Sequence, residues 1–233
     1  ETDPGTPGYG ADVFRRQGIS RVFEDYRLPN GSRVRERRYG IGANVNRPLG
    51  PTWSGSVALN YQNISIRDRD GDVFATDFRG IPLTLSGTGV DDLTTLTFSA
   101  VRDQRDNPSN PSRGSYLSIS STQTIPIGRG SILGNTVEAN YSQYIPVNII
   151  KGLKGEQPQV LALNVQGGTV FGDLPPYNAY LLGGVNSVRG YDFGEVAVSR
   201  SYVLASAEYR FPIYRFIGGV AFLDVGSGLG TQS

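Results

Sequence analysis

Apolar and polar residues alternate with a period of two along most of the chain. Between residues 202 and 211, one face carries Val, Ala, Ala, Tyr and Phe, and the other carries Tyr, Leu, Ser, Glu and Arg. Such alternation is typical of a β-strand with one apolar and one polar face. The pattern predicts nine strands, at Tyr9–Arg16, Arg38–Arg47, Ser54–Gln62, Leu93–Val101, Tyr116–Ile125, Thr136–Tyr144, Val160–Gly168, Tyr202–Phe211 and Phe216–Gly226. Helical spacing is weak and interrupted by Gly and Pro, so we expect an all-β fold.

The polar faces distinguish a membrane barrel from a soluble sheet. They carry Ser, Thr, Asn, Gln and Gly, and lysine occurs only at Lys151 and Lys154, whereas the outer face of a soluble sandwich is usually rich in Lys and Glu. Aromatic residues such as Trp53, Tyr116 and Tyr209 lie near strand ends, as in the girdles of membrane barrels. Most of the strands approach the ~9–11 residues that a tilted strand needs to cross a bilayer. The pattern favours an antiparallel transmembrane β-barrel, and a soluble sandwich or soluble barrel stays open.

The connections between the predicted strands differ in length according to the side on which they fall. One side receives the shorter connections, around 48–52, 103–114, 146–158 and 212–215, and the other receives the long ones, 67–92 and 172–200. Outer-membrane barrels have short turns on one side and long loops on the other. The connections therefore support the barrel prediction.

The composition excludes several kinds of chemistry. The 233 residues contain no Cys, no His and no Met. Without His and Cys the chain lacks Ser-His-Asp catalysis, thiolate nucleophiles and Cys-based zinc sites, so we expect no enzyme activity, no cofactor and no metal. A net charge of +1 gives no reason to expect nucleic acid as a partner. No run of ~18 apolar residues predicts a membrane-spanning helix.

The long connection at about 172–200 contains the most specific motif. Val188, Arg189, Gly190 and Tyr191 resemble the VRG(F/Y) signature of the BamA superfamily of outer-membrane assembly and translocation barrels. Further segments resemble the family's turn before a strand and the two strands after this loop: 106–114, 207–212 and 221–226. The resemblance covers roughly residues 30–228 and is closest to the cyanobacterial and chloroplast-envelope branch.

The resemblance implies a 16-stranded barrel preceded by POTRA domains, with an extracellular loop that folds into the lumen. Because nine strands are visible and Met is absent, we expect residues 1–233 to be part of such a barrel, without the POTRA domains and terminal strands. The resemblance also implies that Arg189 is held in the lumen by Glu208 and Asp224. The strand phase independently places both carboxylates on polar, lumen-facing positions, and Gly190 allows a tight turn beside Arg189.

The function implied by the resemblance is insertion of β-barrel proteins into an outer membrane, or translocation of polypeptides across it. The membrane would be that of a Gram-negative or cyanobacterial cell or the chloroplast outer envelope. The implied partners are client polypeptides, membrane lipids, POTRA domains of the same chain and accessory translocon subunits. A two-partner secretion pore for one substrate, a passive porin and a soluble binding sandwich stay open.

A basic cluster has no place in this scheme. Arg33, Arg35, Arg37 and Arg38 lie together before and within a predicted strand. We interpret them as a solvated rim, and contact with lipid headgroups is the alternative interpretation.

Overall fold

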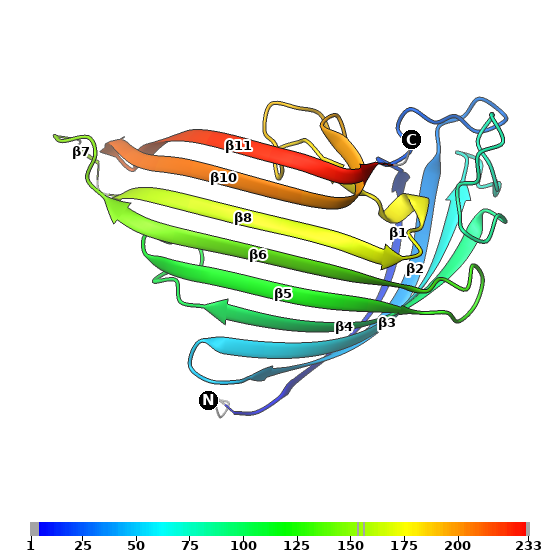
Figure 1. The fold of residues 1–233 in the computed structure, drawn as a ribbon, viewed down its shortest axis with the longest axis horizontal. Helices are drawn as coiled ribbons and strands as arrows, with labels where there is room; N and C mark the ends of the chain where they lie inside the picture. The colour runs from blue at the N-terminus through cyan, green and yellow to red at the C-terminus, as the bar shows by residue number, and fades with distance from the viewer. Residues whose placement is uncertain (1–4, 153, 156, 232–233) are drawn as a thin grey trace.

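A single curved sheet forms most of the computed structural model, which describes residues 5–152, 154–155 and 157–231 (Figure 1). Its long strands are antiparallel and each pairs with the next along the chain, in the order β1-β2-β3-β4-β5-β6-β8-β10-β11. Their bounds are Gly8–Ile19 (β1), Arg35–Pro48 (β2), Trp53–Arg67 (β3), Val90–Asp103 (β4), Gly114–Ile125 (β5), Gly134–Val147 (β6), Gln159–Gly172 (β8), Ala197–Arg215 (β10) and Ile217–Thr231 (β11). These are the nine predicted strands, most of them longer than predicted.

The two faces of the sheet differ as the alternation predicts. Large apolar side chains on the outer face are exposed rather than packed, among them Val57, Leu59, Phe98, Val165 and Leu223. A sheet in a soluble sandwich would bury such residues against a second sheet, and the described residues form one sheet. An exposed apolar band of this extent fits contact with lipid. The soluble sandwich is therefore excluded.

Long and short connections lie at opposite ends of the strands, as predicted. The connections 20–34 and 68–89 lie at the right-hand end in Figure 1, where the connection 173–196 also begins before it folds back along β10 and β11. The turns β2–β3 and β10–β11 lie at the other end. The short strand β7 (Lys154–Gly155) pairs with the end of β10. The connection 173–196 contains a 3₁₀ turn, η1 (Pro176–Asn178), and the short strand β9 (Tyr180–Leu182), which pairs with β10.

A hydrophobic cluster closes the long-loop end of β2–β4. Its buried members come from the strand ends and the covering connections: Phe23, Leu28, Val34, Ile64, Ile66, Leu83, Leu93, Ile132 and Tyr177. Tyr177 belongs to η1, so the cluster also fixes the start of the 173–196 connection. Among the described residues, no helix has the length and apolar character needed to span a membrane.

Candidate functional site

The connection 173–196 folds back against the inner face of β10 and β11. Val188 is buried, and its side chain lies over Gly226 of β11, where Leu204 of β10 is also close. A Cβ atom at Gly226 would lie 2.7 Å from Cγ2 of Val188, closer than real Cβ contacts. Glycine at this position of β11 therefore lets the loop approach the sheet.

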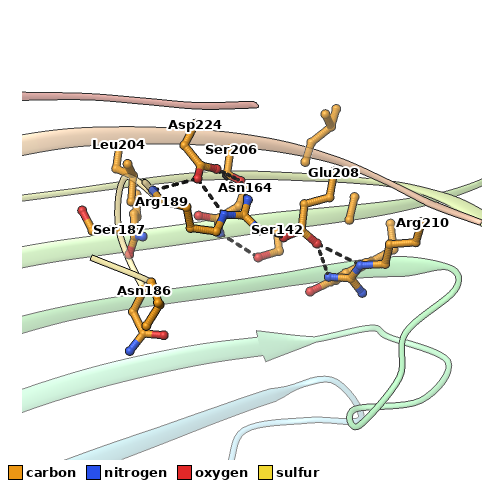
Figure 2. A pocket seen from close by; sticks show the side chains of 15 residues that line it. Ser142, Asn164, Asn186, Ser187, Arg189, Leu204, Ser206, Glu208, Arg210 and Asp224 are labelled. Atoms are coloured by element: carbon orange, nitrogen blue, oxygen red, sulfur yellow. Dashed lines mark hydrogen bonds and ion pairs between the residues drawn. The ribbon is translucent and has the colours of Figure 1, made fainter. Parts of the chain in front are cut away.

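Arg189 follows Val188 and points along the same wall toward two carboxylates (Figure 2). Its Nε and Nη2 donate to Oδ2 and Oδ1 of Asp224, both at 2.7 Å, and its Nη1 donates to Oε1 of Glu208 at 2.7 Å. The backbone amide of Arg189 donates to Asp224 Oδ2 at 3.1 Å. A paired guanidinium–carboxylate contact of this kind fixes orientation as well as charge. We call Arg189, Glu208 and Asp224 the arginine clamp.

Three further side chains complete the surroundings of the clamp. Ser206 lies between its members: it accepts from Arg189 Nη2 at 3.1 Å and donates to Asp224 Oδ1 at 2.7 Å. Arg210 donates through Nε and Nη2 to Glu208 Oε2. The guanidinium carbon of Arg189 lies 3.7 Å from the ring centre of Phe222, a cation–π contact. Two guanidinium groups thus face two carboxylates, and the cluster is neutral.

Because the charged groups of the clamp are partly or almost fully buried, each is stabilised mainly by its partners rather than by water. The Asp224 side chain is 3% exposed, and those of Glu208 and Arg189 are 20% and 23% exposed. Hydrogen bonds to Asp224 raise the pKa of Arg189 above its ordinary range, although desolvation acts in the opposite direction. Arg189 is therefore charged at every physiological pH. Asp224 has almost no access to water and depends on Arg189 and Ser206 for its hydrogen bonds.

The other two motif residues lie outside the clamp. Gly190 has a φ of +94°, in the left-handed region, so the chain turns where glycine carries little strain. The Tyr191 ring is exposed, and its carbonyl accepts from the amide of Gly184 at 2.8 Å. Tyr191 therefore shapes the loop through its backbone.

Tyr177 provides a second attachment of the loop that the sequence analysis missed. It is buried in the hydrophobic cluster, and its hydroxyl donates to Oδ2 of the buried Asp91 at 2.8 Å. Burial and the neighbouring Asp91 carboxylate raise the pKa of Tyr177, which stays a donor. Since 86 residues separate the partners, no local pattern could have signalled this contact. Ser206 and Arg210, in contrast, share the strand phase of Glu208, and that phase could have identified them.

A polar cavity of about 230 Å³ adjoins the clamp, lined by side chains of β6, β8, β10 and the loop (Figure 2). Asn164 donates to Asn140 Oδ1 at 2.7 Å and to Ser142 Oγ at 2.9 Å in this wall. In the part of the chain that the structure describes, no group of three or more His, Cys, Asp or Glu side chains could hold a metal ion. The polar lining of the cavity suits water and polar backbone groups.

Comparison with known proteins places these features in one family. A model described as the Omp85 superfamily domain matches residues 2–233. The chain belongs to the Omp85 superfamily. This Omp85 chain is 30% identical over 205 residues to Outer envelope protein 80, chloroplastic, of Arabidopsis thaliana, covering 88% of the chain and 26% of the relative. It is 28% identical over 228 residues to Outer envelope protein 39, chloroplastic, of the same plant, covering 98% and 56%.

A solved structure shows the same fold. BamA from Haemophilus ducreyi lacking POTRA domains 1–3 matches with a TM-score of 0.73 at 18% identity, covering 96% of the Omp85 chain and 47% of that structure. The expected fold class, an antiparallel outer-membrane barrel, and the expected resemblance to the chloroplast-envelope branch are confirmed. The protein is located in an outer membrane. The chain spans between about a quarter and about half of these relatives' lengths.

Proposed function

We propose that this Omp85 chain forms the part of an outer-membrane barrel that handles polypeptides, inserting β-barrel proteins into the membrane or passing polypeptides across it. The 173–196 connection acts as its internal loop. The observation that carries the proposal is the arginine clamp, in which a loop guanidinium meets the nearly buried carboxylate of Asp224 on the barrel wall. The work is conformational and involves no covalent chemistry.

The clamp favours a gated passage over a passive pore. A pore for small solutes needs an open interior, whereas this loop is held to the wall at Arg189 and to the hydrophobic cluster at Tyr177. The clamp residues keep 20–23% exposure at Glu208 and Arg189, so water reaches the groups that would separate when the loop moves. We infer that the clamp holds the loop in one position until a client polypeptide displaces it.

A reversible crosslink tests whether loop movement is required. A Cβ at Gly226 lies 2.7 Å from Val188 Cγ2, and one carbon–carbon bond adds about 1.5 Å at most. The two Cβ atoms are then about 4.2 Å apart or closer, a distance that a disulfide bridges. The 233 residues contain no cysteine, so Val188→Cys and Gly226→Cys introduce the only two cysteines within these residues.

The full-length double variant is reconstituted in liposomes, and insertion of a β-barrel client or passage of a polypeptide is measured before and after oxidation. We expect oxidation to block this activity and reduction to restore it, while each single variant is unaffected by the oxidant. Full polypeptide handling by the oxidised protein would refute the role of the loop. Permeation of small solutes without any polypeptide activity would instead favour the passive porin.

A two-partner secretion pore shares the same loop and differs in its clients. Handling of several unrelated polypeptides in the same assay supports insertion or general translocation, and handling of one dedicated substrate supports secretion.

A further inference from the structure

Four arginines gather on the outer face of β1, β2 and β3, at the end of the strands where the long connections lie. The strand register aligns three successive rows: Arg15 with Tyr39, then Arg37 with Ser65, then Arg35 with Arg67. Residues two apart on a strand are separated by about 7 Å and neighbouring strands by about 4.8 Å. Arg15, Arg35, Arg37 and Arg67, which we call the outer arginine cluster, therefore occupy a patch about 14 Å high and three strands wide.

The next row identifies this face as the lipid-facing one. Val13, Ile41 and Tyr61 are register partners in the row below Arg15, and all three side chains are exposed. The outer arginine cluster thus begins where the apolar band ends, at the level of lipid headgroups.

The cluster has little internal neutralisation. Within residues 5–152, 154–155 and 157–231, none of the four arginines forms an ion pair with a carboxylate at 4 Å or less. Arg67 donates to Ser65 Oγ at 2.9 Å and to the carbonyl of Gly71, and the buried Nε of Arg37 has no partner within the described residues. Asp92, an outward-facing carboxylate of β4 in the row of Arg15 and Tyr39, is already paired with Arg129 at 2.9 Å.

Tyr39 holds two members of the cluster in place. The guanidinium carbons of Arg15 and Arg37 lie 5.6 and 5.5 Å from the centre of its ring. Two like charges kept beside one ring, with the Nε of Arg37 unpaired among the described residues, form a site for an anion that accepts several hydrogen bonds.

An apolar groove lies directly below the cluster. It has a volume of about 460 Å³ and is lined by outer-face residues of β1–β3 that include Ala11, Val13, Ile41, Ala43 and Leu59. The small side chains Ala11 and Ala43 are register partners, so two alanines lie side by side in the lining of the groove. The row of Ala11 and Ala43 is followed along the strands by the row of Val13 and Ile41, and the next row contains Arg15.

We infer that the outer arginine cluster and this groove together bind one anionic membrane lipid, the headgroup at the arginines and an acyl chain between Ala11 and Ala43. The charge of the cluster selects a phosphate- or sulfate-bearing headgroup with a net negative charge, and the groove selects a hydrocarbon chain. A soluble anion would gain nothing from the groove, and a lipid without net charge would gain less from the arginines than an anionic lipid. This site is on the opposite face of the sheet from the arginine clamp.

Native mass spectrometry of the full-length protein in detergent tests the site. Phosphatidylglycerol and phosphatidylcholine with identical acyl chains are titrated separately, and bound lipid is counted. We expect the Arg37→Gln/Arg67→Gln variant to bind phosphatidylglycerol ~30-fold more weakly, because each arginine near a headgroup contributes about 1 kcal/mol. Phosphatidylcholine, which has a phosphate but no net charge, loses less affinity than phosphatidylglycerol.

The matched control is Arg16→Gln/Arg69→Gln, which removes the same charge. Arg16 lies on the inner face of β1, where it lines a cavity with Glu36 and Arg38, and Arg69 is exposed in the 68–89 connection. This control retains phosphatidylglycerol binding if the site is the outer arginine cluster. Equal weakening in both variants, or none in either, would overturn the inference.

A third variant tests the groove without altering charge. Ala43→Leu fills the space between the alanines, and we expect it to weaken retention of both lipids while circular dichroism stays that of the folded barrel. Unchanged phosphatidylglycerol binding by Ala43→Leu would refute a lipid that spans the cluster and the groove.

Discussion

Replacement of Arg189 by glutamine perturbs the loop attachment most directly. The variant keeps much of the side-chain length but removes the charge that faces Asp224 and Glu208. Glu208 keeps its two hydrogen bonds from Arg210. Asp224, whose side chain is 3% exposed, keeps the hydroxyl of Ser206 and loses its countercharge.

The magnitude follows from the burial of these groups. Removing one member of a fully buried ion pair costs about 3–5 kcal/mol, since the remaining charge is left unpaired. Arg189 is 23% exposed, which allows water to replace part of its role, so the lower end applies. About 3 kcal/mol corresponds to ~100-fold in the equilibrium between attached and released loop.

Hydrogen exchange measures this equilibrium amide by amide. In the attached loop, the amide of Arg189 donates to Asp224, and that of Gly184 donates to the carbonyl of Tyr191. We expect exchange of both loop amides to become ~100-fold faster in Arg189→Gln, while amides in the centres of β10 and β11 keep their rates. Unchanged loop exchange in a folded variant would refute the reasoning.

Arg210→Gln is the matched control, because Arg210 bonds the same carboxylate of Glu208 without touching the loop. We expect its loop exchange to stay close to that of the original protein. The double variant Arg189→Gln/Asp224→Asn removes the unpaired charge together with its partner. We expect its loop to be less destabilised than the sum of the single effects, as holds for directly coupled residues.

Two other outcomes follow from contacts of the 173–196 loop, and a third from contacts within the 68–89 connection. Gly226→Ala places a Cβ 2.7 Å from Cγ2 of Val188, and we expect a loss of about 1–3 kcal/mol in loop attachment, seen as faster hydrogen exchange at 184–191. Tyr177→Phe leaves the buried Asp91 without one donor, at a cost of about 1–3 kcal/mol, and we expect faster proteolysis within 173–182. Burial raises the pKa of Asp77, but hydrogen bonds from two backbone amides and a guanidinium outweigh this effect and hold the pKa below its ordinary value. The stability that these bonds give to the 68–89 connection is therefore present above pH about 4 and lost as the pH falls further, which limited proteolysis across a pH series measures.

The strands were predictable because each has one face toward lipid and one toward the barrel interior, which produces alternation over the whole span. The predicted strands are too short where the alternation of apolar and polar residues breaks. β10 runs to Arg215, beyond Pro212, and its first residues pair with β9. At the long-loop end the rule also fails, since Ile64 and Ile66 are apolar on the inner face. They are covered there by the connections, and no local pattern reports which residues a distant loop covers.

Less of the candidate site than of the fold could be predicted from the alternation of residues alone. The pairing of Arg189 with two carboxylates came from a family resemblance, and strand phase alone supplied the side of the sheet on which Glu208 and Asp224 lie. Phe222 lies on the same face of β11 as Asp224. An aromatic residue on this polar face breaks the alternation, and the sequence does not show that the Arg189 guanidinium packs against its ring. β9 and η1 are too short for any periodicity, and their conformations depend on how Leu182 and Tyr177 pack.

The charge balance of the clamp bears on what passes beside it. Arg189 and Arg210 offset Glu208 and Asp224 within one hydrogen-bonded cluster, so the cluster adds no net charge to the inner wall. The adjoining cavity is lined by these four charged side chains together with neutral polar groups such as Asn164 and Ser142. A wall of this kind exerts little long-range attraction or repulsion on a solute of either sign. A passage for polypeptides of varied sequence needs a wall that neither attracts nor repels charged segments, whereas an ion-selective pore needs rings of side chains with the same charge. Electrostatics and loop attachment thus favour the same function for independent reasons.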